Sequence, residues 1–220
     1  MRVELPKALS ILAHEARGSL GVIQGYLRML RQGVADEATT NRMFQAMHDA
    51  TGRLSALARE ASELAAWCDG RQPEGSEVVT IDDLVGAVAS GAAKKSPREV
   101  HVADDVRSAK VRSQPEGALV ASLTAVTEAV AREAPGAPVA LAASAASGAD
   151  AVLLEIAPAV WDRAPRSQTS ATFNFASGGS GLALVLASYV LDAHEVQLIP
   201  RPDDAGPGVT LQLRREVEGA

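Results

Sequence analysis

A histidine followed directly by a glutamate, His14-Glu15, is a residue pair of this 220-residue chain whose types could do chemistry. An imidazole is a nucleophile or a proton acceptor near neutral pH, and a neighbouring carboxylate can steady its second nitrogen. His14 lies two residues after Leu12 and two before Ala16, so on a helix it points away from the apolar side. Because a histidine at such a position is most often an ordinary surface residue, the surrounding elements decide its significance.

The apolar pattern of residues 1–70 predicts a helical hairpin. Apolar residues spaced by threes and fours form one stripe in each helix, and the second stripe continues over three heptads, which is typical of a bundle seam. Gly33 is the expected end of the first helix, and Asp36 or Thr40 begins the second. The stripes comprise Leu9, Leu12, Ala16, Leu20, Ile23, Leu27 and Leu30, then Met43, Met47, Ala50, Leu54, Leu57, Ala61 and Leu64.

Two such helices have too small a core to stand alone. A second copy would complete a four-helix bundle, so we predict a homodimer through this hairpin. The polar residues that follow, rich in glycine and proline, indicate a linker at 71–77.

Residues 78–218 alternate strand-like and helical pieces. Thr80, with Asp83 three residues on, is the expected N-cap of the first of three helices, and another helix runs over 115–132. Strands are expected at REVHVADD, AKVRS, PVALAASAA and AVLLEIAP, and the chain closes with a hairpin. This order predicts an α/β sandwich, three helices over a mixed sheet.

The composition excludes several classes of protein. The chain has 21 basic and 27 acidic residues and a net charge of −6. It therefore lacks the excess of basic residues that is typical of a nucleic-acid binder. The lone cysteine, Cys68, excludes an intrachain disulfide and a multi-cysteine metal site. No apolar run reaches the roughly 18–20 residues of a membrane span, and the N-terminus does not suit a signal peptide. We therefore expect a cytoplasmic protein without membrane insertion.

The stretch LSILAHEARGSLGVIQGYLRML resembles the H-box of sensor histidine kinases, the first helix of their dimerisation and phosphotransfer domain. The similar features are His14-Glu15, Arg17, Leu20 and the run of residues 23–27. The resemblance implies that His14 is the phosphoacceptor, that Glu15 orients the imidazole and accepts its proton, and that Arg17 steadies the phosphoryl oxygens. The remaining histidines, His48, His101 and His194, lack this context and are predicted to be structural.

The same resemblance implies a surface for docking a receiver domain at Leu20, Gln24 and Leu27. The sequence also departs from the H-box. Gly18 and Ser19 stand where the family usually has threonine and proline. Since that threonine is associated with dephosphorylating the receiver, this activity is not expected.

The second domain resembles, in the order of its elements, the ATP-binding domain of the same family, the histidine kinase/Hsp90 ATPase type. The sequence motifs by which that domain binds a nucleotide are only partly preserved here. Thr124 and Glu128 occupy the places of two asparagines, and the expected Asp-x-Gly-x-Gly turn reads Pro-Ala-Val-Trp-Asp at 158–162. Gly179 and Gly181 preserve part of a phosphate-binding entry into a helix, although a tight turn would need the same glycines. We regard these four residues as a vestigial nucleotide site.

The prediction is thus an α+β protein, a dimeric four-helix bundle followed by a degenerate ATPase-type sandwich. Its expected function is histidine phosphotransfer with a response-regulator receiver, which supplies Mg²⁺. No intrinsic cofactor or metal site is expected, nor is ATP binding, and an upstream hybrid histidine kinase is a further candidate partner. Two alternatives stay open: a divergent kinase that phosphorylates His14 with ATP, and a pseudokinase that acts only by binding.

Overall fold

The computed structural model describes residues 2–33, 36–70, 77–92, 98–113, 117–146, 150–159, 173–176, 181–199 and 208–216. The chain divides into two compact units. Residues Glu4–Arg71 form the first, a helical hairpin, while Met1–Val3 and Gln72–Ala220 together form the second, an α/β unit. The first three residues, which the sequence pattern groups with the hairpin, therefore belong to the α/β unit.

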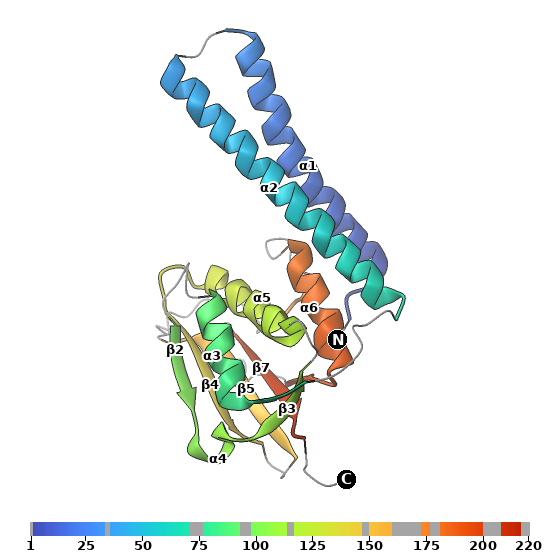
Figure 1. Cartoon of the computed structure of the whole chain (residues 1–220), viewed down its shortest axis with the longest axis vertical. Coiled ribbons are helices and arrows are strands. Elements are labelled where there is room, and N and C mark those ends of the chain that lie inside the picture. Colours follow the sequence, from blue (N-terminus) through green and yellow to red (C-terminus); the bar gives the residue numbers. More distant parts are fainter. Residues whose placement is uncertain are drawn as a thin grey trace, which may run out of the picture. The chain divides into compact units, whose positions relative to one another are not determined.

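The hairpin consists of α1 (Leu5–Arg31) and α2 (Glu37–Cys68), which pack against each other (Figure 1). Gly33, which follows α1, has a φ of 67°, a left-handed conformation that favours glycine. At the start of α2 the Asp36 side chain accepts a hydrogen bond from the Thr39 N–H at 2.7 Å. The predicted helix end at Gly33 and N-cap at Asp36 are thus confirmed.

The seam between the two helices matches the predicted stripe in α2 but not in α1. Met43, Ala50, Leu57 and Leu64 are buried in α2 as the pattern predicts. In α1 the buried residues are Ala8, Ile11 and Ser19. Half-exposed leucines of the predicted α1 stripe, Leu9 at 54%, Leu20 at 46% and Leu27 at 49%, form a second row beside the seam. These three predicted stripe leucines thus remain on the face adjoining the seam.

The α/β unit contains a mixed five-stranded sheet in the order β2-β4-β5-β7-β6. Strand β2 runs parallel to β4, and the other neighbours are antiparallel. A separate antiparallel pair joins β1 to β3. The strands are β1 (Glu77–Thr80), β2 (Arg98–Val102), β3 (Lys110–Ser113), β4 (Val139–Ala145), β5 (Ala151–Pro158), β6 (Gln197–Ile199) and β7 (Val209–Arg214).

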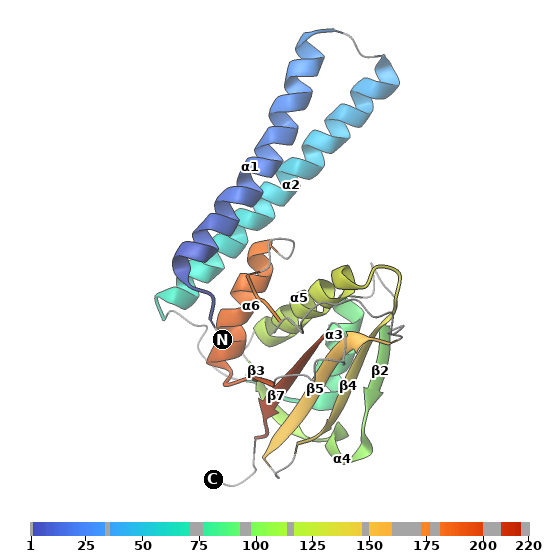
Figure 2. The same cartoon turned by 180° about the vertical axis from the view of Figure 1, so that it is seen from behind.

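Three helices, α3 (Ile81–Ala92), α5 (Ala118–Glu133) and α6 (Gly181–Ala193), cover one side of this sheet (Figures 1 and 2). The core lies between the two layers. Strand β5 alternates accordingly, with Val152, Leu154 and Ile156 fully buried. The predicted sandwich of three helices over a mixed sheet is confirmed.

Local signals in this unit also hold, with one exception. The Thr80 hydroxyl accepts from the Asp83 N–H at 3.1 Å and donates to the Asp83 carboxylate at 2.7 Å, which confirms the predicted cap of α3. The end of the predicted strand REVHVADD instead belongs to a short helix, α4 (Asp104–Arg107), because Val106 turns inward and is completely buried.

Candidate phosphotransfer site

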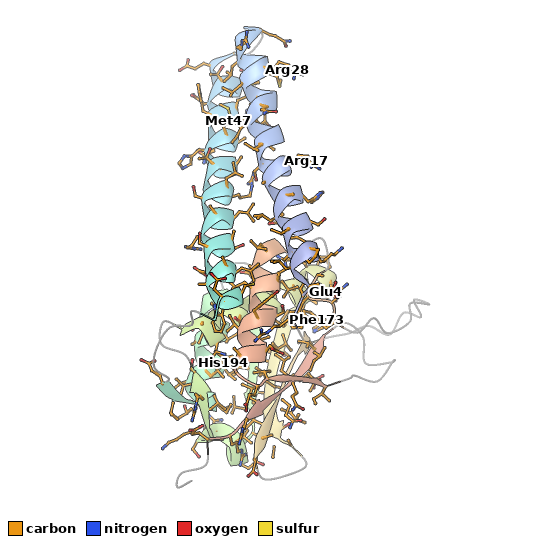
Figure 3. All side chains as sticks on the ribbon, turned by 90° about the vertical axis from the view of Figure 1, so that its right-hand side faces the viewer. Glu4, Arg17, Arg28, Met47, Phe173 and His194 are labelled. Carbon is orange, nitrogen blue, oxygen red and sulfur yellow. The ribbon has the colours of Figure 1, made fainter. Side chains whose placement is uncertain are left out.

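His14 is the tenth residue of α1 and lies on its outer surface. Its side chain is exposed, and it makes no hydrogen bond or ion pair within the described part of the chain. Arg17, one turn further along, is also exposed, and its side chain points away from α2 (Figure 3). A neutral imidazole held on a rigid helix and open to solvent can attack an incoming phosphoryl group. The geometry therefore brings together an accessible nucleophile and a nearby cation.

Glu15 differs from its neighbour in being half-buried. No hydrogen bond joins its carboxylate to the His14 ring among the described residues, so the orienting role of Glu15 stays a prediction. Its charge acts instead on Glu60 of α2. Burial of Glu60, and then the negative charge of Glu15, raise the pKa of the Glu60 carboxyl above its ordinary value.

Glu60 is a residue that the sequence pattern did not single out. Its side chain is half-buried within a helix whose apolar stripe includes Leu57 and Leu64, three residues before it and four after it. The sequence signal that could have identified Glu60 is the position of a charged residue close to the apolar stripe of α2. The hairpin thus carries two like charges near the level of His14, one on each helix.

The expected docking residues, Leu20, Gln24 and Leu27, are exposed on α1. The glycines that separate them, Gly21 and Gly25, have open space where a Cβ would stand. Intramolecular packing therefore does not require glycine there. The surface of α1 at these two glycines is free of bulky groups, and receiver docking on it remains a prediction.

The vestigial nucleotide site is described only in part. Thr124 packs beside α3, since a Cβ built on Gly91 would lie 3.4 Å from its hydroxyl oxygen. Glu128 is half-buried on the same helix as Thr124. Gly181 begins α6 with a φ of 71°, so a left-handed turn into the helix accounts for this glycine. Gly179 and the residues at 160–162 lie outside the described residues.

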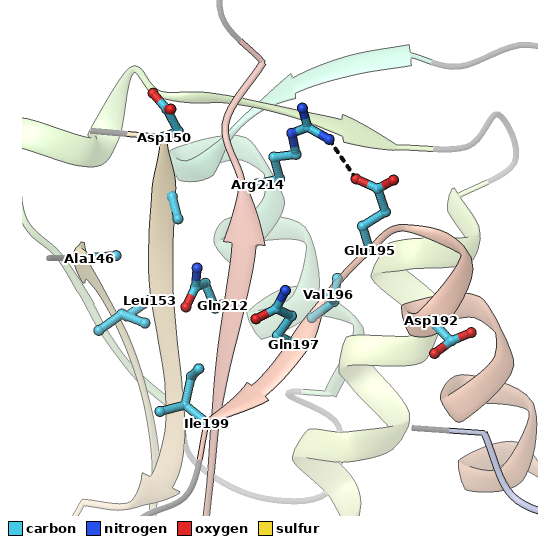
Figure 4. A pocket seen from close by; sticks show the side chains of 11 residues that line it. Ala146, Asp150, Leu153, Asp192, Glu195, Val196, Gln197, Ile199, Gln212 and Arg214 are labelled. Atoms are coloured by element: carbon cyan, nitrogen blue, oxygen red, sulfur yellow. Dashed lines mark hydrogen bonds and ion pairs between the residues drawn. The ribbon is translucent and has the colours of Figure 1, made fainter. Parts of the chain in front are cut away.

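A hollow of about 780 Å³ lies elsewhere in the α/β unit, over strands β5, β6 and β7. Figure 4 shows Leu153, Gln197 and Gln212 lining it, and an ion pair of 2.8 Å between Arg214 and Glu195 at one side. None of the residues predicted for the site lines this hollow. Among the described residues no three His, Cys, Asp or Glu side chains gather in a way that could hold a metal ion.

None of the described helices combines the length and the apolar character that a membrane span requires. No protein-family model matches the sequence, and no curated protein matches it significantly.

Solved structures do resemble the fold. A chain of the Acinetobacter baumannii histidine kinase AdeS matches with a TM-score of 0.64 at 16% identity, over 94% of this chain and 98% of that one. Histidine kinase ThkA, in a complex with the response regulator TrrA, matches at 0.58 and 14% identity, over 94% of this chain and 61% of that one. Full-length ShkA in complex with AMPPNP matches at 0.59 and 18% identity, over 99% of this chain and 47% of that one.

The protein has a histidine kinase-like fold. The similarity extends over both the hairpin and the α/β unit. The predicted resemblance to this family is thus confirmed for the fold, and the assignment of the H-box stretch stays a prediction.

The raised pKa of the Glu60 carboxyl predicts an effect of its charge on stability. A carboxyl whose pKa is higher in the folded state contributes stability below its ordinary pKa of 4.5 and loses it as the pH rises through the folded value. We therefore expect Glu60→Gln to raise the midpoint of thermal unfolding at pH 7 by about 1–2 °C. The gain should vanish below pH 4.5.

Calorimetry across this pH range measures the effect. Glu63→Gln is the matched control, because Glu63 lies on the same helix but pairs with Arg59 at 3.8 Å near the surface. A gain that persists at low pH would exclude ionisation of Glu60 as its cause.

Proposed function

We propose that this protein is a histidine phosphotransferase, which accepts a phosphoryl group on His14 from a response-regulator receiver and returns it. The observation that carries the proposal is an exposed histidine on α1 of a hairpin with the histidine kinase-like fold. The complex of histidine kinase ThkA with the response regulator TrrA supports the class of partner.

The reaction asks little chemistry of this chain. The Nε2 lone pair of His14 attacks the phosphorus of the receiver's aspartyl phosphate, and the bond to the aspartate oxygen breaks as its electron pair returns to the carboxylate. Glu15 takes the role of steadying the protonated ring nitrogen, and Arg17 that of neutralising charge on the phosphoryl oxygens. The receiver brings Mg²⁺, so catalysis depends mainly on positioning.

The described nucleotide residues favour transfer over autophosphorylation. Glu128 would place a negative charge beside a triphosphate, and Thr124 packs against α3. The left-handed backbone conformation at Gly181 accounts for this glycine without a bound phosphate. A cytoplasmic phosphorelay, fed by a hybrid histidine kinase, is the setting that such a protein would serve.

The leucine row of α1 supports a homodimer. Leu9, Leu20 and Leu27 are each about half exposed and lie beside the seam of the hairpin. Such a row is costly to leave in water, at about 25 cal/mol per Å² of apolar surface. A second hairpin would bury the Leu9 end of this row in a four-helix bundle, and Leu20 and Leu27 at the other end are left for the receiver.

The identity of the phosphoacceptor can be tested without a known receiver. Phosphoramidate, a small phosphoryl donor, should label His14 with an acid-labile group in preference to the other exposed histidines, because Arg17 one turn away neutralises charge on the phosphoryl oxygens. His14→Gln should reduce this labelling at least a hundredfold, whereas His48→Gln, at an exposed position of α2, should leave it unchanged. Phosphorus NMR and peptide mass spectrometry measure the site. Undiminished labelling of His14→Gln would refute the assignment.

Nucleotide binding separates the proposal from the kinase alternative. Titration calorimetry with Mg²⁺–ATP up to millimolar concentration should give no binding heat, because Glu128 would place a negative charge beside the triphosphate and Thr124 packs against α3. Micromolar affinity would favour the divergent kinase instead. A Gly181→Ala variant would then report whether the glycine-rich entry takes part.

The dimer interface predicts the effect of a charge in the leucine row. Leu9→Glu should shift the protein from dimer to monomer at micromolar concentration, since it would bury an unpaired carboxylate. Lys7→Glu is the control, because Lys7 lies on the His14 side of α1 and is exposed. Sedimentation equilibrium measures the change. A monomeric wild-type protein, or equal behaviour of both variants, would argue against this interface.

A further inference from the structure

The hollow over β5, β6 and β7 is lined at its centre by one row of side chains from these three strands (Figure 4). Leu153, Gln212 and Gln197 stand directly opposite one another on neighbouring strands, so their side chains share one face of the sheet. Leu154 and Leu211, which follow or precede them in their strands, are buried. Because successive residues of a strand point to opposite faces, the row lies on the face away from α3, α5 and α6.

Two side-chain amides of this row are available to a ligand. Neither the Gln197 nor the Gln212 side chain makes a hydrogen bond within the part of the chain that the structure describes. Residues directly opposite on antiparallel strands have Cβ atoms roughly 5 Å apart, so both amides can contact the same ligand. Each offers a donor and an acceptor, as a peptide group also does. The centre of the hollow is thus suited to a polypeptide backbone.

The hollow also carries a carboxylate, that of Asp150, which has no counter-charge among the described residues. Asp150 is exposed and makes no ion pair there. The other charged residues that line the hollow are paired: Arg214 lies 2.8 Å from Glu195, and Asp192 lies 2.7 Å from Arg2. Figure 4 shows the Arg214 side chain directed toward Glu195. The charge that remains in the hollow is therefore negative.

Apolar surface lies between the carboxylate and the two amides. Leu153 follows Asp150 by three residues, roughly 10 Å along a strand, and its side chain is half-buried. Ile199, two residues beyond Gln197 on β6, adds a second apolar group to the lining. The methylene stem of a long basic side chain packs on such a surface while its charged head stays with a carboxylate.

We propose that this hollow is a docking site for an extended segment of a partner protein, and that the segment presents an arginine side chain. The guanidinium pairs with Asp150, the stem lies over Leu153, and the peptide groups of the segment bond to the two amides. Residues 72–220 hold 19 acidic and 12 basic residues, so the wider charge of this unit also attracts a basic segment. A hollow of about 780 Å³ has room for more than one side chain. The site concerns the α/β unit alone and does not depend on phosphotransfer by His14.

NMR of the full-length ¹⁵N-labelled protein tests the proposal with a blocked five-residue peptide that carries one central arginine. At millimolar peptide the side-chain amide signals of Gln197 and Gln212 should shift and reach saturation, because the peptide groups bond to them. A matched peptide with citrulline in place of arginine should bind at least tenfold more weakly, since citrulline has nearly the shape of arginine without its charge. Unshifted glutamine signals, or equal affinity for the two peptides, would overturn the proposal.

Variants of the protein locate the contact within the hollow. Asp150→Asn removes the charge but keeps the shape, and it should weaken binding of the arginine peptide at least tenfold. Glu155→Gln is the matched control, with an expected change below twofold, because Glu155 lies on the same face of β5 as Leu153 but does not line the hollow. Gln212→Met should weaken both peptides about threefold through the loss of one hydrogen bond. Equal effects of Asp150→Asn and Glu155→Gln would refute the site.

Free argininamide distinguishes a segment from a small molecule as the occupant. It should bind at least tenfold more weakly than the arginine peptide, because it lacks the flanking peptide groups that bond to Gln197 and Gln212. Equal affinity of argininamide and the peptide would overturn the docking of a segment and would indicate a site for a free guanidinium compound.

Discussion

The packing of α1 against α2 is the constraint on which the rest of the candidate site depends. Because Ala8, Ile11 and Ser19 form the buried side of α1, the helical period places His14 on the outside. The same seam determines which neighbours are half-buried, Glu15 on α1 and Glu60 on α2. One helix face thus sets both the accessibility of the nucleophile and the charges behind it.

In the α/β unit, packing and backbone conformation explain two of the residues at the vestigial nucleotide site. Gly181 is needed for a left-handed turn into α6, and Thr124 fits against α3 beside Gly91. Both residues have structural reasons to stay as they are without a nucleotide. Helix α6 also holds the Val3 backbone by hydrogen bonds with the Ser188 and Tyr189 side chains, so the described contacts give this helix a structural role.

Signals within a few residues of one another were predictable from the sequence. The cap at Thr80, the helix end at Gly33 and the N-cap at Asp36 each depend on local hydrogen bonds or backbone conformation. The order of strands and helices predicted the sandwich because its alternation follows from one buried face. The exposed position of His14 followed from periodicity in the same way.

The parts that could not be predicted depend on contacts between distant residues. Two apolar faces compete on α1, and only the partner helix decides that Ile11 is buried and Leu9 is left half-exposed. The interaction of Glu60 with Glu15 crosses the hairpin, and hydrogen bonds join Val3 to residues more than 180 positions away. Neither leaves a periodic pattern in the sequence.

A phosphotransfer reaction with an activated acyl phosphate needs no deep pocket in the acceptor protein, because the receiver contributes the leaving group and the metal. What the acceptor must supply is a nucleophile at the right depth and a surface that holds the donor in line. In the proposed function, the described structure meets the first need because the helical period places His14 on the exposed side of α1. In the proposed function, the second need falls on the exposed groups Leu20, Gln24 and Leu27 of α1.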